Sequence, residues 1–292
     1  MSKLMEIEGV TVFTTAPSDV CLIISGAVHG NEPAGPKAMQ MLRELISKND
    51  WVLSGNVYGI ISNPRALEQN VRFIEENLNR AFGRNENPAS YEALRAEEIS
   101  CWLTETVAKY HHSYLLDLHS VSVGETRIAI FPQHTKKSKQ WCEHVSPIPF
   151  VIGSDEHILP GTLMGAMDKL GGISVSIECG NHTSEHGASV ALQHIENALE
   201  SLSMLNKKRT SYSRTITYDQ PKRTYILTDI IKPTNGFVFT HPVESETFLK
   251  KGEVFARDTL GERTAPYDCF IIMPSKNPQP NDYDAGFLAV LA

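Results

Sequence analysis

Short apolar runs alternate with amphipathic helical patterns through the first two-thirds of the chain. The run from Val20 to Ser25 predicts a buried strand. The segment from Pro33 to Ile46 predicts a helix, because proline favours the first helical turn and apolar residues recur on one face. Further strands are expected at 55–61, 113–118, 128–131 and 172–177, and further helices at 91–108 and 184–205. This alternation indicates an α/β fold with a mixed, largely parallel central sheet flanked by helices.

The pattern changes at residues 206–209, a basic and polar stretch with the composition of a linker. No convincing helical pattern follows it. Short apolar runs separated by turn residues predict strands at 224–227, 236–240, 253–256, 269–273 and 286–291. We therefore expect two domains, an α/β domain over residues 1–208 and a small all-β domain over residues 209–292.

Composition and charge exclude several classes of partner. The 292 residues are 41% hydrophobic and 21% charged, and no apolar run is long enough to span a bilayer. The net charge of −7 disfavours nucleic acid and anionic membranes as partners, whereas a homo-oligomer stays open. The N-terminus lacks the features of a signal peptide, which predicts a cytoplasmic protein. The scattered cysteines form no C-x-x-C pair, which argues against disulfides and a thiolate zinc site.

A candidate metal-binding motif, His29-Gly30-Asn31-Glu32, follows the first predicted strand and precedes a predicted helix. Histidine and glutamate three residues apart on such a turn can aim at one point. Zinc accepts imidazole nitrogen and carboxylate oxygen, and a catalytic zinc site commonly has three protein ligands. The motif alone is a weak signal, since an isolated match is more often a solvated pair.

A third candidate ligand, His119, follows the apolar run that ends in Asp117-Leu118. We expect it to leave the sheet at the same carboxyl edge as His29, where open α/β sheets bind their ligands. The alternative, a buried core histidine, is disfavoured because the predicted strand has already ended. Asp117 either hydrogen-bonds the imidazole of His119 or has a purely structural use.

Glu178 follows an apolar run in the same way. A partly buried carboxylate costs free energy unless it has a partner. One satisfactory use is as a general base. In this role Glu178 takes a proton from a water activated by the metal and passes it to a leaving nitrogen. The alternative is a buried acid in a salt bridge.

Arginine and asparagine side chains supply the positive charge that an anionic substrate needs in a negatively charged protein. Asn63-Pro64-Arg65 follows the predicted strand at 55–61, and Asn79-Arg80 lies downstream. Because arginine makes bidentate contacts with carboxylates, Arg65, Asn79 and Arg80 are predicted to form a local positive pocket. Arg72 and Arg84 either add to this positive field or are solvated surface charges, and for each alone the second interpretation is favoured.

Together these motifs resemble a known enzyme family. They occur in the order and rough spacing of the succinylglutamate desuccinylase/aspartoacylase family, whose members have a zinc carboxypeptidase-like fold. The resemblance covers residues 20–205 well and the β-rich remainder more loosely. It is carried by His29-Gly30-Asn31-Glu32, Asn63-Pro64-Arg65, Asn79-Arg80, Asp117-Leu118-His119 and Ile177-Glu178.

The resemblance implies a role for each matching position. His29, Glu32 and His119 would bind one zinc ion per chain, and Glu178 would be the general base and later the acid. Arg65 would polarise the scissile carbonyl and stabilise the oxyanion. The C-terminal domain would narrow the channel to the metal and favour small substrates. The residues that would contact the substrate are Asn63, Asn79, Arg80 and, from the C-terminal domain, Tyr283.

The chain departs from the family pattern in three places, one of which is Asn77, at a position where an acid is more common. Where aspartoacylases carry a further substrate-binding arginine, residues 167–169 read Met-Asp-Lys. An acid there would repel a second substrate carboxylate, which argues against acetylaspartate as the substrate. His182 and His186 either line the pocket or contact a second metal, or they lie at the start of a helix capped by Thr183 or Ser184. The helix start is the favoured interpretation.

These features predict a zinc-dependent hydrolase that cleaves the amide bond of a small N-acyl amino acid. Two alternatives stay open. One is a zinc carboxypeptidase or amidase that acts on peptide-like substrates, and the other is a non-catalytic metal-binding module. The acyl group and the amino acid are not determined by these patterns, and two nitrogens with one carboxylate also suit cobalt or manganese.

Overall fold

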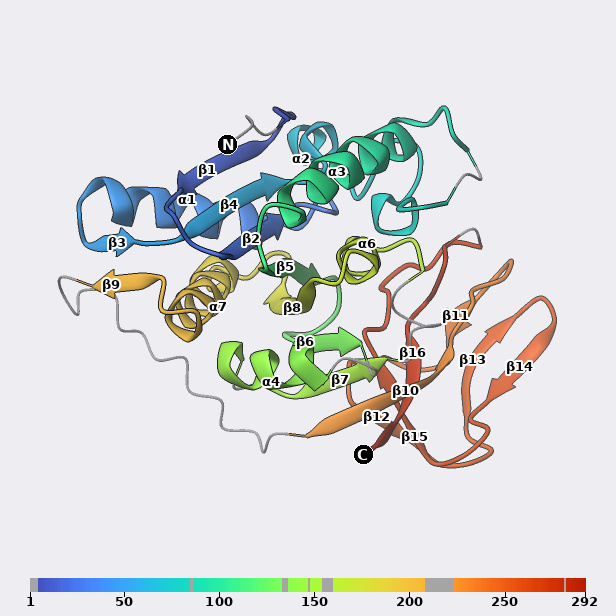
Figure 1. Cartoon of the computed structure of the whole chain (residues 1–292). Coiled ribbons are helices and arrows are strands. Elements are labelled where there is room, and N and C mark those ends of the chain that lie inside the picture. Colours follow the sequence, from blue (N-terminus) through green and yellow to red (C-terminus); the bar gives the residue numbers. More distant parts are fainter. Residues whose placement is uncertain are drawn as a thin grey trace.

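The computed structural model describes residues 5–84, 87–132, 136–146, 148–153, 160–207, 223–280 and 282–292. Its centre is an 11-stranded sheet in the order β1-β4-β2-β5-β8-β6-β7-β10-β16-β15-β12 (Figure 1). The strands are β1 (Val10–Thr14), β2 (Val20–Gly26), β4 (Asn56–Ile61), β5 (His112–Val121), β6 (Arg127–Pro132), β7 (Phe150–Gly153), β8 (Ile173–Asn181), β10 (Thr224–Ile230), β12 (Thr247–Leu249), β15 (Cys269–Ile272) and β16 (Phe287–Leu291).

The middle of the sheet is parallel. β2 lies between β4 and β5 and is parallel to both, and β5 is parallel to β8. β1 and β6 run antiparallel to their neighbours β4 and β8. The predicted mixed, largely parallel sheet is thus confirmed for this part of the chain.

Helices cover both faces of the parallel strands. Alternate residues of β2 enter two separate hydrophobic clusters, because successive side chains of a strand point to opposite faces. Leu22 and Ile24 pack with the helices α1 (Ala34–Ser47), α4 (Lys136–Val145) and α7 (Gly187–Ser201). Cys21 and Ile23 pack with α3 (Tyr91–Val107), α6 (Leu163–Lys169) and the short 3₁₀ helix η1 (Leu78–Arg80).

Two glycines bring the start of α1 against the end of β2. A Cβ atom on Gly35 would lie 2.9 Å from the Cα of Gly26, a separation that real Cβ atoms do not show. Only glycine fits at this crossing. The close approach holds the intervening loop, residues 27–33, at the carboxyl edge of the sheet.

The C-terminal part consists of strands among its described residues, as predicted. β10 pairs in parallel with β7, and β16, β15 and β12 extend the same sheet (Figure 1, orange and red). A second sheet contains β11 (Val238–Phe239), β13 (Val254–Asp258) and β14 (Gly261–Thr264). The predicted boundary at residue 208 lies outside the described residues, so the division into two domains stays a prediction.

Several predicted elements have different bounds. The helix expected at 184–205 spans only Gly187–Ser201, with His186 and not Thr183 or Ser184 at its N-cap. Part of the expected linker is a strand, β9 (Leu205–Lys207), which pairs with β3 (Trp51–Leu53). β5 and β8 continue beyond their apolar runs, so polar residues at their ends stay in the ladder. In the part of the chain that is described, no helix combines the length and the apolar character needed to cross a membrane.

Candidate active site

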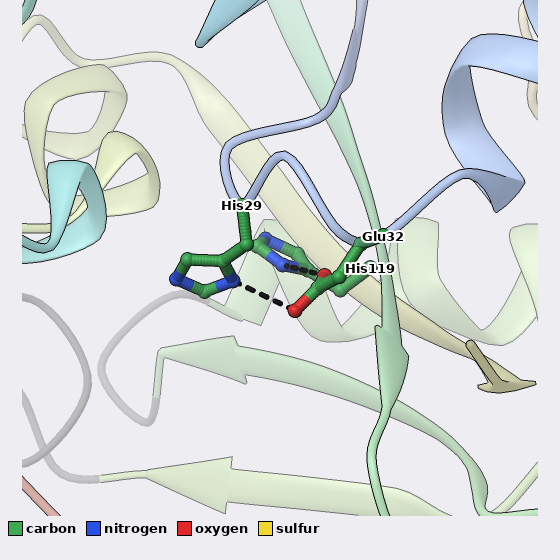
Figure 2. A group of neighbouring side chains, drawn as sticks. All are labelled: His29, Glu32 and His119. Atoms are coloured by element: carbon green, nitrogen blue, oxygen red, sulfur yellow. Dashed lines mark hydrogen bonds and ion pairs between the residues drawn. The ribbon is translucent and has the colours of Figure 1, made fainter. Parts of the chain in front are cut away.

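The three predicted metal ligands lie together at the carboxyl edge of the sheet. His29 and Glu32 come from the loop after β2, and His119 comes from β5 (Figure 2). Nδ1 of His29 is 2.8 Å from Oε1 of Glu32, and Nδ1 of His119 is 3.0 Å from Oε2. All three side chains are buried, and their candidate ligand atoms lie within 4.8 Å of one another. One ion can therefore contact all three.

Each imidazole is oriented by a hydrogen bond on its far nitrogen. Nε2 of His29 donates to Oδ1 of Asn77 at 3.0 Å, and Nε2 of His119 donates to Oδ2 of Asp117 at 2.9 Å. Metal-bound histidines commonly make such a contact, which fixes the ring and the tautomer. It leaves both Nδ1 atoms facing Glu32. Of the two readings of Asp117 from the sequence, the contact with His119 is the correct one.

The electrostatics of the cluster favour a cation. Burial lowers the pKa of His29 to about 4, which keeps this imidazole neutral, as a metal ligand must be. Burial also acts to lower the pKa of His119, but the carboxylates of Asp117 and Glu32 outweigh it and raise the pKa well above its usual value. Two carboxylates around His119 thus stabilise positive charge at this point.

Glu178 lies beside the cluster with an unsatisfied oxygen. It is paired with His119 in the ladder between β5 and β8, so the two side chains share one face of the sheet. Its Oε2 is buried and has no hydrogen-bond partner among the described residues. Burial raises the pKa of Glu178 to about 7, and nearby His119 opposes this rise. A buried carboxylate oxygen without a partner is costly, so the arrangement suits a carboxylate that faces a ligand.

The arginine at the cluster is Arg72, not Arg65. Nη1 of Arg72 is 3.3 Å from Oε1 of Glu32. The carbonyl of Arg72 also accepts a hydrogen bond from the backbone N–H of Gly30 at 3.2 Å. By contrast, the guanidinium of Arg65 lies 4.3 Å from the ring centre of Tyr91. Both arginines are exposed, so the contact with Glu32 and not burial distinguishes Arg72. Of the two interpretations of Arg72, this contact supports a contribution to the charge of the site. No described contact brings Arg65 to the cluster.

Gly30 allows the loop that carries the ligands to meet α2 (Pro64–Gln69). A Cβ atom at Gly30 would lie 2.0 Å from the carbonyl carbon of Ala66. This contact leaves no room for a side chain. Glycine at position 30 is thus required by packing, in addition to the metal-binding chemistry of His29 and Glu32.

A buried carboxylate, Glu92 in α3, holds the segment that follows α2. It accepts hydrogen bonds from the backbone N–H groups of Ile74, Glu75 and Glu76 at 2.7, 3.0 and 3.2 Å. This segment carries Arg72 and Asn77, which contact Glu32 and His29. Sequence reasoning missed Glu92, because an acid in the first turn of a helix is common and carries no sign of its partners.

Asn63 has a structural use in place of the predicted contact with substrate. It is fully buried at the N-cap of α2, where Oδ1 accepts from the N–H of Ala66. Its Nδ2 donates to Glu92 at 3.1 Å. Both ends of the amide are therefore engaged inside the protein.

A cavity of about 180 Å³ is connected to the cluster through Asn77 and is lined by residues from 76–93 and by Tyr283. Asn77, which contacts His29, forms one wall. Arg80 forms another, and its guanidinium lies 4.4 Å from the ring centre of Tyr283. Asn79 accepts a hydrogen bond from the N–H of Leu163 through Oδ1, which orients its amide. The remaining residues of the lining are Glu76, Ala81, Arg84, Asn87 and Ala93.

His182 approaches the cluster through one intermediate residue. Its Nδ1 lies 2.8 Å from Oγ of Ser120, whose backbone N–H donates to Oε2 of Glu32 at 3.1 Å. Burial lowers the pKa of His182. His186 begins α7 without a side-chain capping bond. Of the two histidines left open by the sequence, His182 is thus the one near the site.

Comparison with known proteins gives a consistent result. The model of the succinylglutamate desuccinylase/aspartoacylase catalytic domain matches residues 19–205. A succinylglutamate desuccinylase from Ectopseudomonas mendocina is 26% identical over 286 residues, which cover 92% of this chain and 82% of that protein.

Solved structures share the fold. The succinylglutamate desuccinylase from Vibrio cholerae has a TM-score of 0.77 at 20% identity, with 97% of this chain and 85% of that chain covered. Murine aminoacylase 3 has a TM-score of 0.64 at 14% identity, with 95% and 97% covered. The architecture thus extends over nearly the whole chain, the C-terminal strands included.

Proposed function

The chain belongs to the succinylglutamate desuccinylase/aspartoacylase family, and from this premise we propose that it is a zinc-dependent hydrolase that removes the acyl group from a small N-acyl amino acid. One observation carries the proposal. A buried cluster of His29, Glu32 and His119 lies beside a carboxylate, Glu178, whose Oε2 has no partner in the described part of the protein. A cytoplasmic location and a homo-oligomer stay predictions.

The residues of the cluster fit one zinc ion per chain. His29 and His119 would hold it through Nδ1 and Glu32 through its carboxylate, a donor set that zinc accepts. The hydrogen bonds on both Nε2 atoms support this assignment. When bound, zinc supplies Lewis acidity and a water that loses its proton near neutral pH.

Glu178 is proposed as the group that moves the proton. Its unpartnered oxygen would accept a proton from the attacking water and deliver it to the leaving nitrogen of the amide. The same carboxyl first takes up and then releases the proton, so the two steps return Glu178 to its starting state.

Arg72 is proposed to stabilise the negative charge that develops on the carbonyl oxygen. This role was expected for Arg65, but Arg72 is the arginine in contact with Glu32. Arg80, with Asn79 and Tyr283, is proposed to bind a carboxylate of the substrate in the adjoining cavity.

The size of the cavity favours this activity over its alternatives. A volume of about 180 Å³ suits a small acid better than a polypeptide, which argues against a carboxypeptidase or amidase of long substrates. The unpartnered oxygen of Glu178 argues against a non-catalytic metal-binding module, because such a module has no use for it.

A substrate screen tests the proposal. The zinc-loaded protein is incubated with N-acetyl, N-succinyl and N-formyl amino acids, and released amine is measured. We expect hydrolysis of one acyl class, loss of activity with a chelator and recovery with zinc. His119→Ala should lose metal and activity together. Activity confined to longer peptides, or no hydrolysis by protein that holds stoichiometric zinc, would overturn the proposal.

A further inference from the structure

The proposed carboxylate-binding arginine is already paired with an acid of the chain. Nη2 of Arg80 is 3.0 Å from Oδ2 of Asp284. Asp284 follows Tyr283, whose ring stacks on the same guanidinium, and both residues precede β16. Arg80 and Asp284 are 204 positions apart in the sequence. The C-terminal segment thus brings an aromatic ring and a negative charge onto one arginine.

One guanidinium nitrogen of Arg80 has no hydrogen-bond partner among the described residues. Nη1 donates to the carbonyl of Asn79 at 2.6 Å, and Nη2 donates to Asp284. Nε is buried and has no hydrogen-bond partner among the residues that the structure describes. Nε and Nη2 lie along one edge of the guanidinium plane, the edge that grips a carboxylate with two parallel hydrogen bonds. Asp284 occupies half of that edge.

We propose that Asp284 is a specificity-determining residue that stands in for the substrate's carboxylate on Arg80 and is displaced when the substrate binds. The inference rests on the proposed function, because it takes Arg80 to be the residue that binds this carboxylate. An incoming carboxylate forms two hydrogen bonds along the Nε–Nη2 edge, and Asp284 releases Nη2 and turns to solvent.

Burial explains why a stand-in is needed. The side chain of Arg80 is only 19% exposed, and a buried guanidinium without a counter-ion is costly. Burial lowers the pKa of Arg80, and the charge of Asp284 opposes this effect. Asp284 thus gives the buried guanidinium a counter-ion and holds it in place when no substrate is bound.

Displacement of Asp284 from Arg80 depends on the charge of the incoming group. Asp284 is 22% exposed, so it can be rehydrated when it leaves the arginine. A substrate with a carboxylate restores the lost ion pair, whereas a substrate with a neutral amide at that position does not. A neutral analogue therefore binds with the pair intact and gains nothing from Arg80. Binding of the proper substrate is weakened, since one ion pair must break before the other forms.

The test compares Asp284→Asn with the wild-type enzyme on two substrates. These are the best N-acyl amino acid from the screen and its α-amide. In the variant, KM for the acid should fall by about fivefold, the scale of one partly exposed ion pair, while KM for the amide and both kcat values stay within about twofold. Asp282→Asn, a neighbouring acid in the same segment, is the matched control and should change neither KM.

Binding without turnover gives a second readout. Sodium succinate is titrated calorimetrically into the zinc-loaded wild type, Asp284→Asn and Asp284→Ser, and we expect tighter binding to both variants. An unchanged or higher KM for the acid together with unchanged or weaker succinate binding would overturn the stand-in role. If the wild type hydrolyses no N-acyl amino acid, the proposed function fails instead, so the two failures are distinguishable. Asp284→Ser keeps the test valid should Asp284→Asn misfold.

Discussion

Two regions of the site are built in different ways. The strand-end region, which contains His29, Glu32, His119 and Glu178, lies on or directly after β2, β5 and β8. The loop-end region, which contains Arg72, Asn77, Arg80 and Tyr283, has little regular structure apart from η1. The first region is positioned by ladder register, in which His119 faces Glu178. The second is positioned by single polar contacts between segments far apart in the chain.

The two regions also differ in how firmly their side chains are held in position. A parallel ladder in the core fixes its side chains through many backbone hydrogen bonds and buried apolar contacts, so its geometry is hard to change. A loop held by one carboxylate and one C-terminal ion pair changes with a single substitution. In the proposed function, the metal ligands and the proton-transfer group thus lie on the rigid part. The groups proposed to bind the carboxylate of the substrate lie on the adjustable part, together with Arg72.

Replacement of Glu178 gives the largest expected effect and tests the strand-end region alone. Glu178→Gln should lower kcat by about 10²–10⁴-fold, because the amide cannot take up the proton, while KM and zinc content stay near wild type. Steady-state kinetics with metal analysis measure both. The exposed acid Glu185, changed to Gln, serves as control. Near-normal kcat in Glu178→Gln would remove the proton-transfer role.

Arg72 belongs to the loop-end region but contacts Glu32 of the strand-end region. Its replacement is expected to have the next largest effect on kcat. Arg72→Met should lower kcat by about 10²–10³-fold, the usual loss for one donor to the oxyanion. Arg65→Met should leave kcat within about threefold, since its stacking on Tyr91 is an exposed contact. The opposite order of the two effects would restore the role predicted for Arg65 from the sequence.

Replacement of Glu92 tests how strongly its carboxylate holds the backbone of the loop-end region in place. Glu92→Gln places an NH₂ group against backbone N–H donors, so at least one of them loses its acceptor. We expect the free energy of unfolding to fall by about 1–3 kcal/mol and kcat/KM to fall by about tenfold as Arg72 loses its position. Chemical denaturation and kinetics measure the two changes. Glu97→Gln, an exposed position on α3, is the control. Equal effects in both variants would show that Glu92 does not anchor the segment.

The strand-end region could be predicted from the sequence because its residues sit in or beside local apolar patterns. His29, Glu32, His119 and Glu178 each follow an apolar run, and parallel strands bring such ends together. The exact ends of β5 and β8 were missed, since polar residues inside a ladder look like the start of a loop.

The loop-end region could be predicted only in part. Arg80 was predicted from its charge and Tyr283 from a family resemblance, and the two side chains do lie together. The position of Arg72 depends on the backbone of Gly30 and on the anchor of Glu92, and neither contact leaves a periodic or local pattern. Asp284 went unnoticed for the same reason, because its partner is 204 residues away.

The parallel pairing of β10 with β7 has a consequence for how the protein is made and engineered. Until residues 224–226 are synthesised, β7 is a bare edge with unpaired backbone groups beside β6, a surface prone to aggregation. The chain therefore completes its main sheet late, after most of its length has left the ribosome. The segment with Tyr283 and Asp284 leads directly into β16, which pairs with β10. A transplant of this segment from a relative must therefore keep both strands in register.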